Sequence, residues 1–303
     1  MSKYLFCYFT GNAPEEERVH FALSKDGYNF KYLNKNEAVI TQKLGKKCCR
    51  DPFIFKDKDG LFHIIATDMR SADGWANNNS MVIWDSTDLI NWTDERIIDF
   101  SQFDSTKNAN RVWAPEVVFD KEKGEYMIYW SHNNADDDLD TIIWHAYTKD
   151  FRTLTTEPKI LYRPESGLCA IDGDIIEKDG RYYLFVADGK QDGICYVVSD
   201  KASGPYTEPE NNKISVADTA LEGNCMYKLA DCEKYIMIAD QFRSGGYFMQ
   251  ESDDLINFTK VDETKFSLNH LRPRHGSMLI ITDEEYDRLA KFYGIEEQEE
   301  NYA

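Results

Sequence analysis

Short apolar segments separated by polar turns recur along the chain. Four stretches, residues 51–68, 114–131, 172–188 and 222–240, each hold a strand-like run, a polar turn and a second run of aromatic and β-branched residues. This pattern is typical of a β-hairpin. The hairpins begin at intervals of 63, 58 and 50 residues, near the repeat length of the antiparallel blades of a propeller.

A third strand follows each hairpin and ends in a polar corner, such as 86–92 or 252–258, where Ser is closely followed by Asp. Side chains in such corners bond to nearby backbone. A fifth copy is split, because 275–282 resembles a first strand without its second and 4–9 a second strand without its first. We therefore predict an all-β fold, a single domain over residues 1–303 that forms a five-bladed β-propeller. Its fifth blade would be closed by strands from both ends of the chain, whereas a β-sandwich would not repeat one unit four times.

The segment after the last predicted strand has a helical pattern. Thr282 and Glu285 have the spacing of a capping box, and apolar residues recur at helical spacing from Tyr286 to Tyr293. We predict a short helix over about 283–294 that packs outside the propeller and takes no part in catalysis.

The composition of the chain limits the kinds of binding partner that we expect. Acidic residues outnumber basic ones by 54 to 35, giving a formal charge of −19, so nucleic acid and anionic membranes are disfavoured and a neutral, polar substrate is compatible. The N-terminal apolar run is too short for a signal peptide. The seven cysteines lack the spacing of a disulfide framework or zinc site. Together these features lead us to expect a cytoplasmic protein, and they predict no oligomeric state.

The first strand of each propeller blade lines the central channel, so equivalent residues of the repeats become neighbours there. The predicted neighbours are five acidic residues and one histidine: Asp51, Glu116, Asp172 with Asp174, Glu222 and His275. Buried carboxylates are costly unless they are paired. Two or three carboxyl groups around one opening are the apparatus of glycoside hydrolysis, with one acid and one base.

Five short sequence motifs indicate a protein family that the chain resembles. They are Arg50-Asp51-Pro52, Trp113-Ala114-Pro115-Glu116, Ile171-Asp172-Gly173, Glu222-Gly223 and Arg274-His275-Gly276-Ser277. Because these motifs occur in the family's order, the chain resembles glycoside hydrolase family 43, whose members are five-bladed propellers that act on arabinose- and xylose-containing plant polysaccharides. Gly173 and Asn224 depart from the proline that the family often has at these places.

The resemblance implies a role for each of three carboxyl groups. Asp51 matches the general base that activates water, Glu222 the general acid, and Asp172 the carboxylate that raises the pKa of the acid and orients it. Asp174, two residues along on the same face, is the rival of Asp172. The family inverts configuration, which implies that base and acid lie roughly 6.5–9.5 Å apart.

Other residues are candidates for binding. Trp75 and Trp113 are predicted platforms for a sugar ring, although Trp113 also fits the core, and Arg274 would donate to sugar hydroxyls or pair with a carboxylate. Glu116 is expected to be structural or substrate-facing. The resemblance places His275 in the channel near a calcium ion or water. A hydrogen-bonded core histidine is the alternative.

The predicted function is an inverting, exo-acting α-L-arabinofuranosidase or β-xylosidase that cleaves small oligosaccharides without an organic cofactor. An endo-acting arabinanase is the alternative within enzymes, and it would need an open groove across the face of the propeller. A carbohydrate-binding propeller without catalysis is the alternative from another class.

Overall fold

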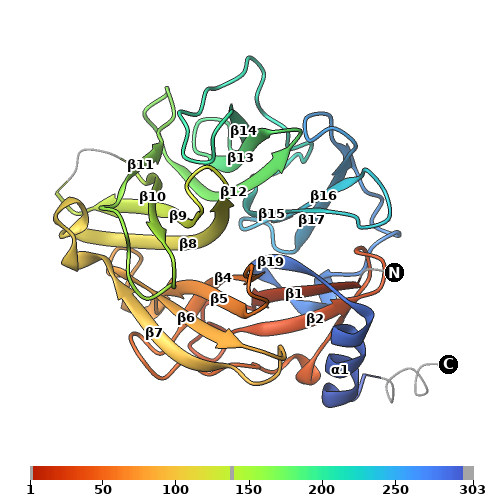
Figure 1. Ribbon diagram of the computed structural model, residues 1–303. Helices are drawn as coiled ribbons and strands as arrows, with labels where there is room; N and C mark the ends of the chain where they lie inside the picture. Colours follow the sequence, from red (N-terminus) through yellow and green to blue (C-terminus); the bar gives the residue numbers. More distant parts are fainter. Residues whose placement is uncertain (1–2, 137–139, 296–303) are drawn as a thin grey trace.

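The computed structural model describes residues 3–136 and 140–295. In these residues, nineteen strands form five antiparallel sheets around a central axis, and Figure 1 shows them as the blades of a propeller. No helix of the described residues is long and apolar enough to cross a membrane. The predicted five-bladed fold is confirmed.

The strands fall into blades in chain order, except at the closure. Blade 1 contains β4 (Cys49–Lys56), β5 (Phe62–Asp68), β6 (Ser80–Ser86) and β7 (Thr93–Asp99). Blade 2 contains β8 (Ala109–Asp120), β9 (Glu125–Asn134), β10 (Ile142–Thr148) and β11 (Lys159–Tyr162). Blade 3 contains β12 (Ala170–Lys178), β13 (Arg181–Asp188) and β14 (Gly193–Ser199). Blade 4 contains β15 (Glu222–Lys228), β16 (Tyr235–Asp240), β17 (Tyr247–Ser252) and β18 (Thr259–Lys260).

Blade 5 joins the two ends of the described chain, as the split repeat predicts. It contains β19 (Arg274–Ile281), β1 (Lys3–Phe9), β2 (His20–Ser24) and β3 (Phe30–Tyr32). β19 and β1 pair from Lys3 opposite Ile281 to Phe9 opposite Arg274. This pairing closes the ring without an open edge at the seam.

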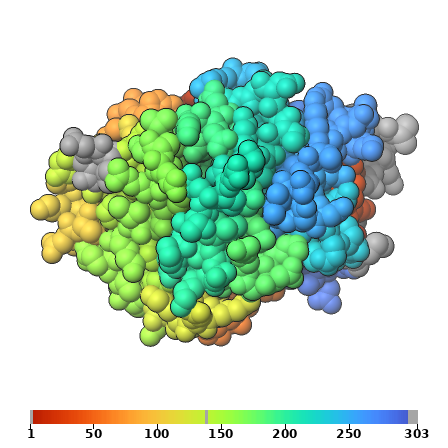
Figure 2. Space-filling model, turned by 90° about the horizontal axis from the view of Figure 1, so that it is seen from above, coloured from red at the N-terminus to blue at the C-terminus, as the bar shows by residue number. Residues whose placement is uncertain are grey.

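Blade 3 has three regular strands where its neighbours have four. Residues 207–214 run along its outer edge instead, through backbone bonds such as Thr207 N to Val198 O at 2.9 Å and Ile214 N to Ile194 O at 2.9 Å. Figure 2 shows this connection in teal on the side of the molecule, between the yellow-green blade 2 and the blue blade 4. The edge of β14 is thereby covered.

The core is divided among the interfaces between blades. Each of the five interfaces holds one cluster of buried apolar side chains. Alternation along β1 illustrates the reason, because Phe6 packs toward blade 4 while Leu5 and Cys7 pack toward blade 1. All seven cysteines lie in the described part of the chain and carry free thiols.

The helix α1 (Asp283–Tyr293) follows β19 and lies at the periphery of the propeller (Figure 1). Thr282 and Glu285 form the predicted capping box. Tyr286, Leu289 and Ala290 are buried in the cluster between blades 5 and 1. Single 3-10 turns occur at η1 (Asn34–Asn36), η2 (Ser71–Asp73), η3 (Phe100–Gln102), η4 (Asp104–Thr106) and η5 (Asn269–Leu271).

The innermost strand of every blade carries a one-residue β-bulge at the same height. The bulges interrupt the register just after Arg50, Trp113, Ile171, Glu222 and Arg274. The next residue has a positive φ in four of the five strands: 49° at Asp51, 46° at Ala114, 55° at Asp172 and 57° at Gly223. Bulges bend a strand and re-aim its side chains, so this repeated feature determines what faces the channel.

Candidate active site

The bulges sort the channel residues into layers. The residues before the bulge are Arg50, Trp113, Ile171, Glu222 and Arg274, and those at the bulge are Asp51, Ala114, Asp172, Gly223 and His275. Glu116 and Asp174 come two residues after the bulge position. The predicted equivalence of Asp51, Glu116 and Glu222 is therefore wrong, because the three residues belong to three different layers.

The first two layers line one cavity of about 340 Å³ at the channel. Its wall contains the predicted residues Asp51, Asp172, Glu222, His275, Trp75, Trp113 and Arg274. It also contains residues that sequence reasoning did not select, among them Phe9, Asn12, Asp240 and Phe242. Asp240 ends the second strand of its blade, as Asp68 and Asp188 do in theirs. Asp240 could have been selected from the sequence by this recurrence of Asp at the end of second strands.

The carboxylates of the two aspartates are held by hydrogen bonds that connect neighbouring blades. Thr67 Oγ1 donates to Asp51 Oδ2 at 2.8 Å and accepts from Ala114 N, also at 2.8 Å. Asp172 Oδ2 accepts from Gly223 N at 2.8 Å. Asp tolerates positive φ better than most residues, but the conformation still carries strain, and such strain clusters at functional sites.

His275 lies between the two aspartates. Its Nδ1 is 3.5 Å from Asp51 Oδ1 and 3.9 Å from Asp172 Oδ2. Burial would lower the pKa of this imidazole, but the Asp172 and Asp51 carboxylates raise the pKa of His275 to about 9. A side chain at position 223 would collide with His275, since a Cβ there would come within 2.8 Å of its Cβ.

The acidities of Asp51 and Glu222 are driven in opposite directions. Burial alone would raise the pKa of Asp51, but its hydrogen bond to His275 and the charges of His275 and Arg50 hold that pKa below its usual value. Burial, followed by the like charges of Asp172 and Asp240, raises the pKa of Glu222 to about 8, against the opposing effect of Arg274. These opposite shifts favour an ionised Asp51 and a protonated Glu222 at neutral pH.

Asp172 and Arg274 connect these groups. Burial raises the pKa of Asp172, His275 opposes this and Asp51 adds to it. Arg274 Nη2 lies 3.5 Å from Glu222 Oε1, and its Nε binds Asp240 Oδ2. Arg274 thus holds a carboxyl group on either side, which agrees with the predicted alternative of pairing with carboxylates.

Arg50 and the predicted tryptophan platform form the opposite wall. The Arg50 guanidinium lies 4.4 Å from the centre of the Phe9 ring and 5.0 Å from that of Trp75, whose surface is 51% exposed. Arg50 Nη1 binds Asn12 Oδ1 at 2.8 Å and the fully buried Glu17 at 3.1 Å. An exposed indole supported from behind is suited to stacking on a sugar ring.

Trp113 and the deeper carboxyl groups have more structural surroundings. The Trp113 ring faces the Arg111 guanidinium at 5.2 Å while lining the cavity. Glu116 accepts from Tyr129 Oη at 2.7 Å, and Asp174 accepts from Met226 N at 2.6 Å. Burial raises the pKa of Asp174 to about 7. Neither Glu116 nor Asp174 lines the cavity.

The calcium ion expected near His275 stays a prediction. Among residues 3–136 and 140–295, no group of three His, Cys, Asp or Glu side chains is arranged to hold a metal ion. The side chains here therefore do not fit a directly ligated metal, and we assign it no step.

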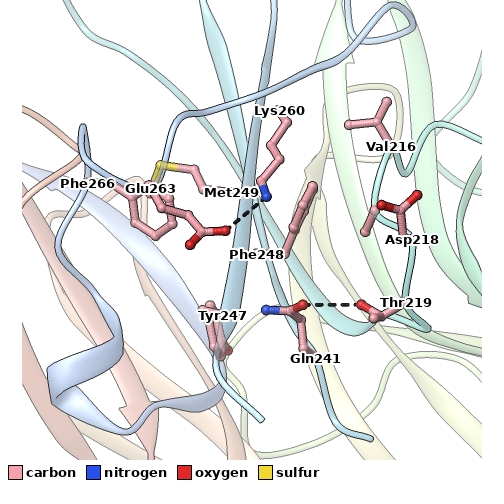
Figure 3. Close-up of a pocket in the computed structure, with 11 residues that line it drawn as sticks. Val216, Asp218, Thr219, Gln241, Tyr247, Phe248, Met249, Lys260, Glu263 and Phe266 are labelled. Carbon is pink, nitrogen blue, oxygen red and sulfur yellow. Dashed lines mark hydrogen bonds and ion pairs between the residues drawn. The ribbon is translucent and has the colours of Figure 1, made fainter. Parts of the chain in front are cut away.

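Another hollow, of about 170 Å³, lies in blade 4 and the loops beside it (Figure 3). Four of its polar side chains are paired with one another. Lys260 Nζ binds Glu263 Oε1 at 2.9 Å and Thr219 Oγ1 donates to Gln241 Oε1 at 3.2 Å. It lacks the facing carboxyl groups of the channel, so the candidate site is the cavity at the bulges.

The fold and the site define the class of protein. Two carboxyl groups that share one cavity, with pKa values shifted in opposite directions, are what a glycoside hydrolase uses as its acid and its base. Residues 1–287 match the model of a family related to glycoside hydrolase family 43 and described as a probable glycosyl hydrolase domain. The chain belongs to this family, as the five motifs predicted.

Individual relatives differ in their sugars. An α-L-arabinofuranosidase of Bifidobacterium longum subsp. longum is 27% identical in an alignment of 215 positions that covers 63% of this chain and 20% of that protein. This chain therefore spans a small part of that relative's length.

Solved structures share the fold at low identity. A xylan β-1,4-xylosidase of Bacillus halodurans is 13% identical with a TM-score of 0.60, over 93% of this chain and 51% of that one. A putative exo-β-1,3-galactanase of Bifidobacterium bifidum is 14% identical with a TM-score of 0.61, over 88% and 89%.

Proposed function

We propose that the chain hydrolyses glycosidic bonds by a single displacement that inverts configuration at the anomeric carbon. Asp51 takes a proton from a water molecule as the water attacks that carbon. Glu222 gives its proton to the glycosidic oxygen as the bond to the leaving group breaks. The opposite pKa shifts of these two groups in one cavity are the observation that carries the proposal.

Asp172 and His275 assist without exchanging the reacting proton. The charge of Asp172 helps to keep Glu222 protonated. His275 stays cationic at neutral pH and holds Asp51 ionised. Removal of either charge would therefore bring the acidities of the base and the acid closer together.

For the substrate, we propose a terminal arabinose or xylose unit of a small oligosaccharide. The wall of Arg50, Phe9 and Trp75 bounds the cavity on one side, which favours exo action over the open groove of an endo-acting enzyme. The arabinofuranosidase and xylosidase relatives support these two sugars.

The test is turnover of a panel of phenyl and 4-nitrophenyl glycosides of α-L-arabinofuranose and β-D-xylose. Wild type is expected to hydrolyse at least one sugar. With its phenyl glycoside, Asp51→Asn and Glu222→Gln should each lose about a hundredfold or more, the usual contribution of a general acid or base. Asp174→Asn is the matched control, a buried carboxyl that does not line the cavity. Full activity in both variants would overturn the proposal.

A further inference from the structure

A second hollow adjoins the central cavity on the side of blades 3 and 4. Its volume is about 270 Å³, and it shares Ile171, Glu222 and Phe242 with the central cavity. Neither Asp51 nor Asp172 lines it. Glu222 is therefore the one carboxyl group of the proposed mechanism that faces both spaces.

Given the proposed function, the placement of Glu222 determines on which side of the central cavity the leaving group lies. The general base acts beneath the sugar that is being released from the chain end, and Asp51 lies only in the central cavity. The general acid must reach the oxygen between that sugar and the leaving group. Since Glu222 borders both spaces, the leaving group points into the second hollow.

The walls of the second hollow suit a neutral sugar. Phe242 is 38% exposed at the boundary between the two spaces, and an exposed aromatic face is a platform for the apolar face of a sugar ring. The Arg243 guanidinium lies 5.2 Å from the centre of the Phe242 ring, and its Nη1 binds Asp192 Oδ2 at 2.7 Å.

The ion pair between Arg243 and Asp192 also determines which ligand charge the hollow accepts. Asp192 already balances the positive charge of Arg243 across the gap between the loops after β13 and β16. Asp188 adds a further carboxyl group to the wall. The hollow therefore offers no free cation to an acidic ligand, and its hydrogen-bonding groups suit hydroxyls.

We propose that this hollow binds the neutral sugar unit that leaves, with Phe242 stacked on its ring. The preferred substrate then carries at least one sugar beyond the scissile bond, and Phe242 determines specificity for that unit.

The experiment compares substrates with and without a sugar in the leaving group. The pairs are xylobiose with β-D-xylosyl fluoride and α-1,5-arabinobiose with α-L-arabinofuranosyl fluoride, and the pair that wild type hydrolyses is used. For Phe242→Ala, kcat/KM for the disaccharide should fall about fivefold more than kcat/KM for the fluoride, since an aromatic contact is worth about 1 kcal/mol and 1.4 kcal/mol corresponds to tenfold. Phe242→Tyr, which keeps the ring, should restore most of the difference.

Phe292→Ala is the matched control, because Phe292 is 60% exposed on α1 and lines neither hollow. It should leave both rates unchanged. An equal effect of Phe242→Ala on both substrates, or no effect on either, would overturn the leaving-group hollow while the proposed hydrolysis stands. No turnover of either pair by wild type would overturn the proposed function and this inference with it.

Discussion

Replacing Asp172 by Asn should move the alkaline limb of the pH–activity profile to lower pH. Glu222 must be protonated to act, so activity is lost as pH rises through its pKa of about 8. Asp172 contributes the largest like charge to that pKa. Asn tolerates the positive φ of 55° at this position, and its amide oxygen can still accept from Gly223 N.

The size of the shift follows from the spacing of the two groups. Asp172 Oδ2 bonds to the backbone of the residue after Glu222, so the carboxyl groups are neighbours. Two charges on the order of 6 Å apart at an effective dielectric constant of ~20 interact by ~3 kcal/mol, or ~2 pKa units. We therefore expect a shift of about 1 to 2 units in the pKa of Glu222.

The assay is kcat/KM between pH 5 and 10 with a phenyl glycoside, whose leaving group needs protonation, since kcat/KM reports the pKa values of the free enzyme. Asp174→Asn is the matched control, because Asp174 is a buried carboxyl that is not among the main contributors to the pKa of Glu222. An alkaline limb of Asp172→Asn that coincides with wild type, or that moves to higher pH, would refute this account of the acid.

Two further predictions concern stability. In Gly276→Ala the new Cβ would meet the Cys7 carbonyl oxygen at 2.1 Å and Tyr8 Cα at 2.8 Å, and we expect urea unfolding to show a loss of about 3 kcal/mol at the ring closure. Gly124→Ala meets no atom within 4 Å and carries only the strain of its φ of 68°, about 1 kcal/mol; a loss in Gly276→Ala no larger than this would count against the prediction. In Glu17→Gln the fully buried partner of Arg50 loses its charge, which should cost about 3 kcal/mol. Glu17 Oε1 also accepts from Ser71 N at 3.0 Å in the loop that carries Trp75, so activity should fall as well; an unfolding midpoint equal to wild type would show that the pair is not needed.

The architecture could be read from the sequence because its signals are local and repeated. Hairpins, corners and a capping box each need only a few neighbouring residues, and their spacing determined the number of blades. The split fifth blade was predictable because its two halves carry complementary parts of one repeat, and β1 pairs with β19 accordingly. Blade 3 differs from the repeat because residues 207–214 bond irregularly along β14.

The layering of the channel was harder to predict. The sequence analysis treated Asp51, Glu116 and Glu222 as equivalent positions of the repeat, whereas the bulges place them one to three residues apart along equivalent strands. The repeats do begin at the bulge residues Asp51, Ala114 and Asp172. Glu116 lies two residues beyond that position, and in blade 4 Gly223 rather than Glu222 occupies it. Phe242 follows a strand in a loop outside the repeat, so periodicity could not reveal it.

The direct test of the central claim is the anomer of the first product. Proton NMR of wild type, recorded within minutes of adding an arabino- or xylo-oligosaccharide that it hydrolyses, identifies the configuration before mutarotation mixes the anomers. A single displacement between Asp51 and Glu222 predicts that the first sugar released has the inverted configuration. A first product with retained configuration would contradict the account, because it would require a covalent intermediate on one of these carboxyl groups.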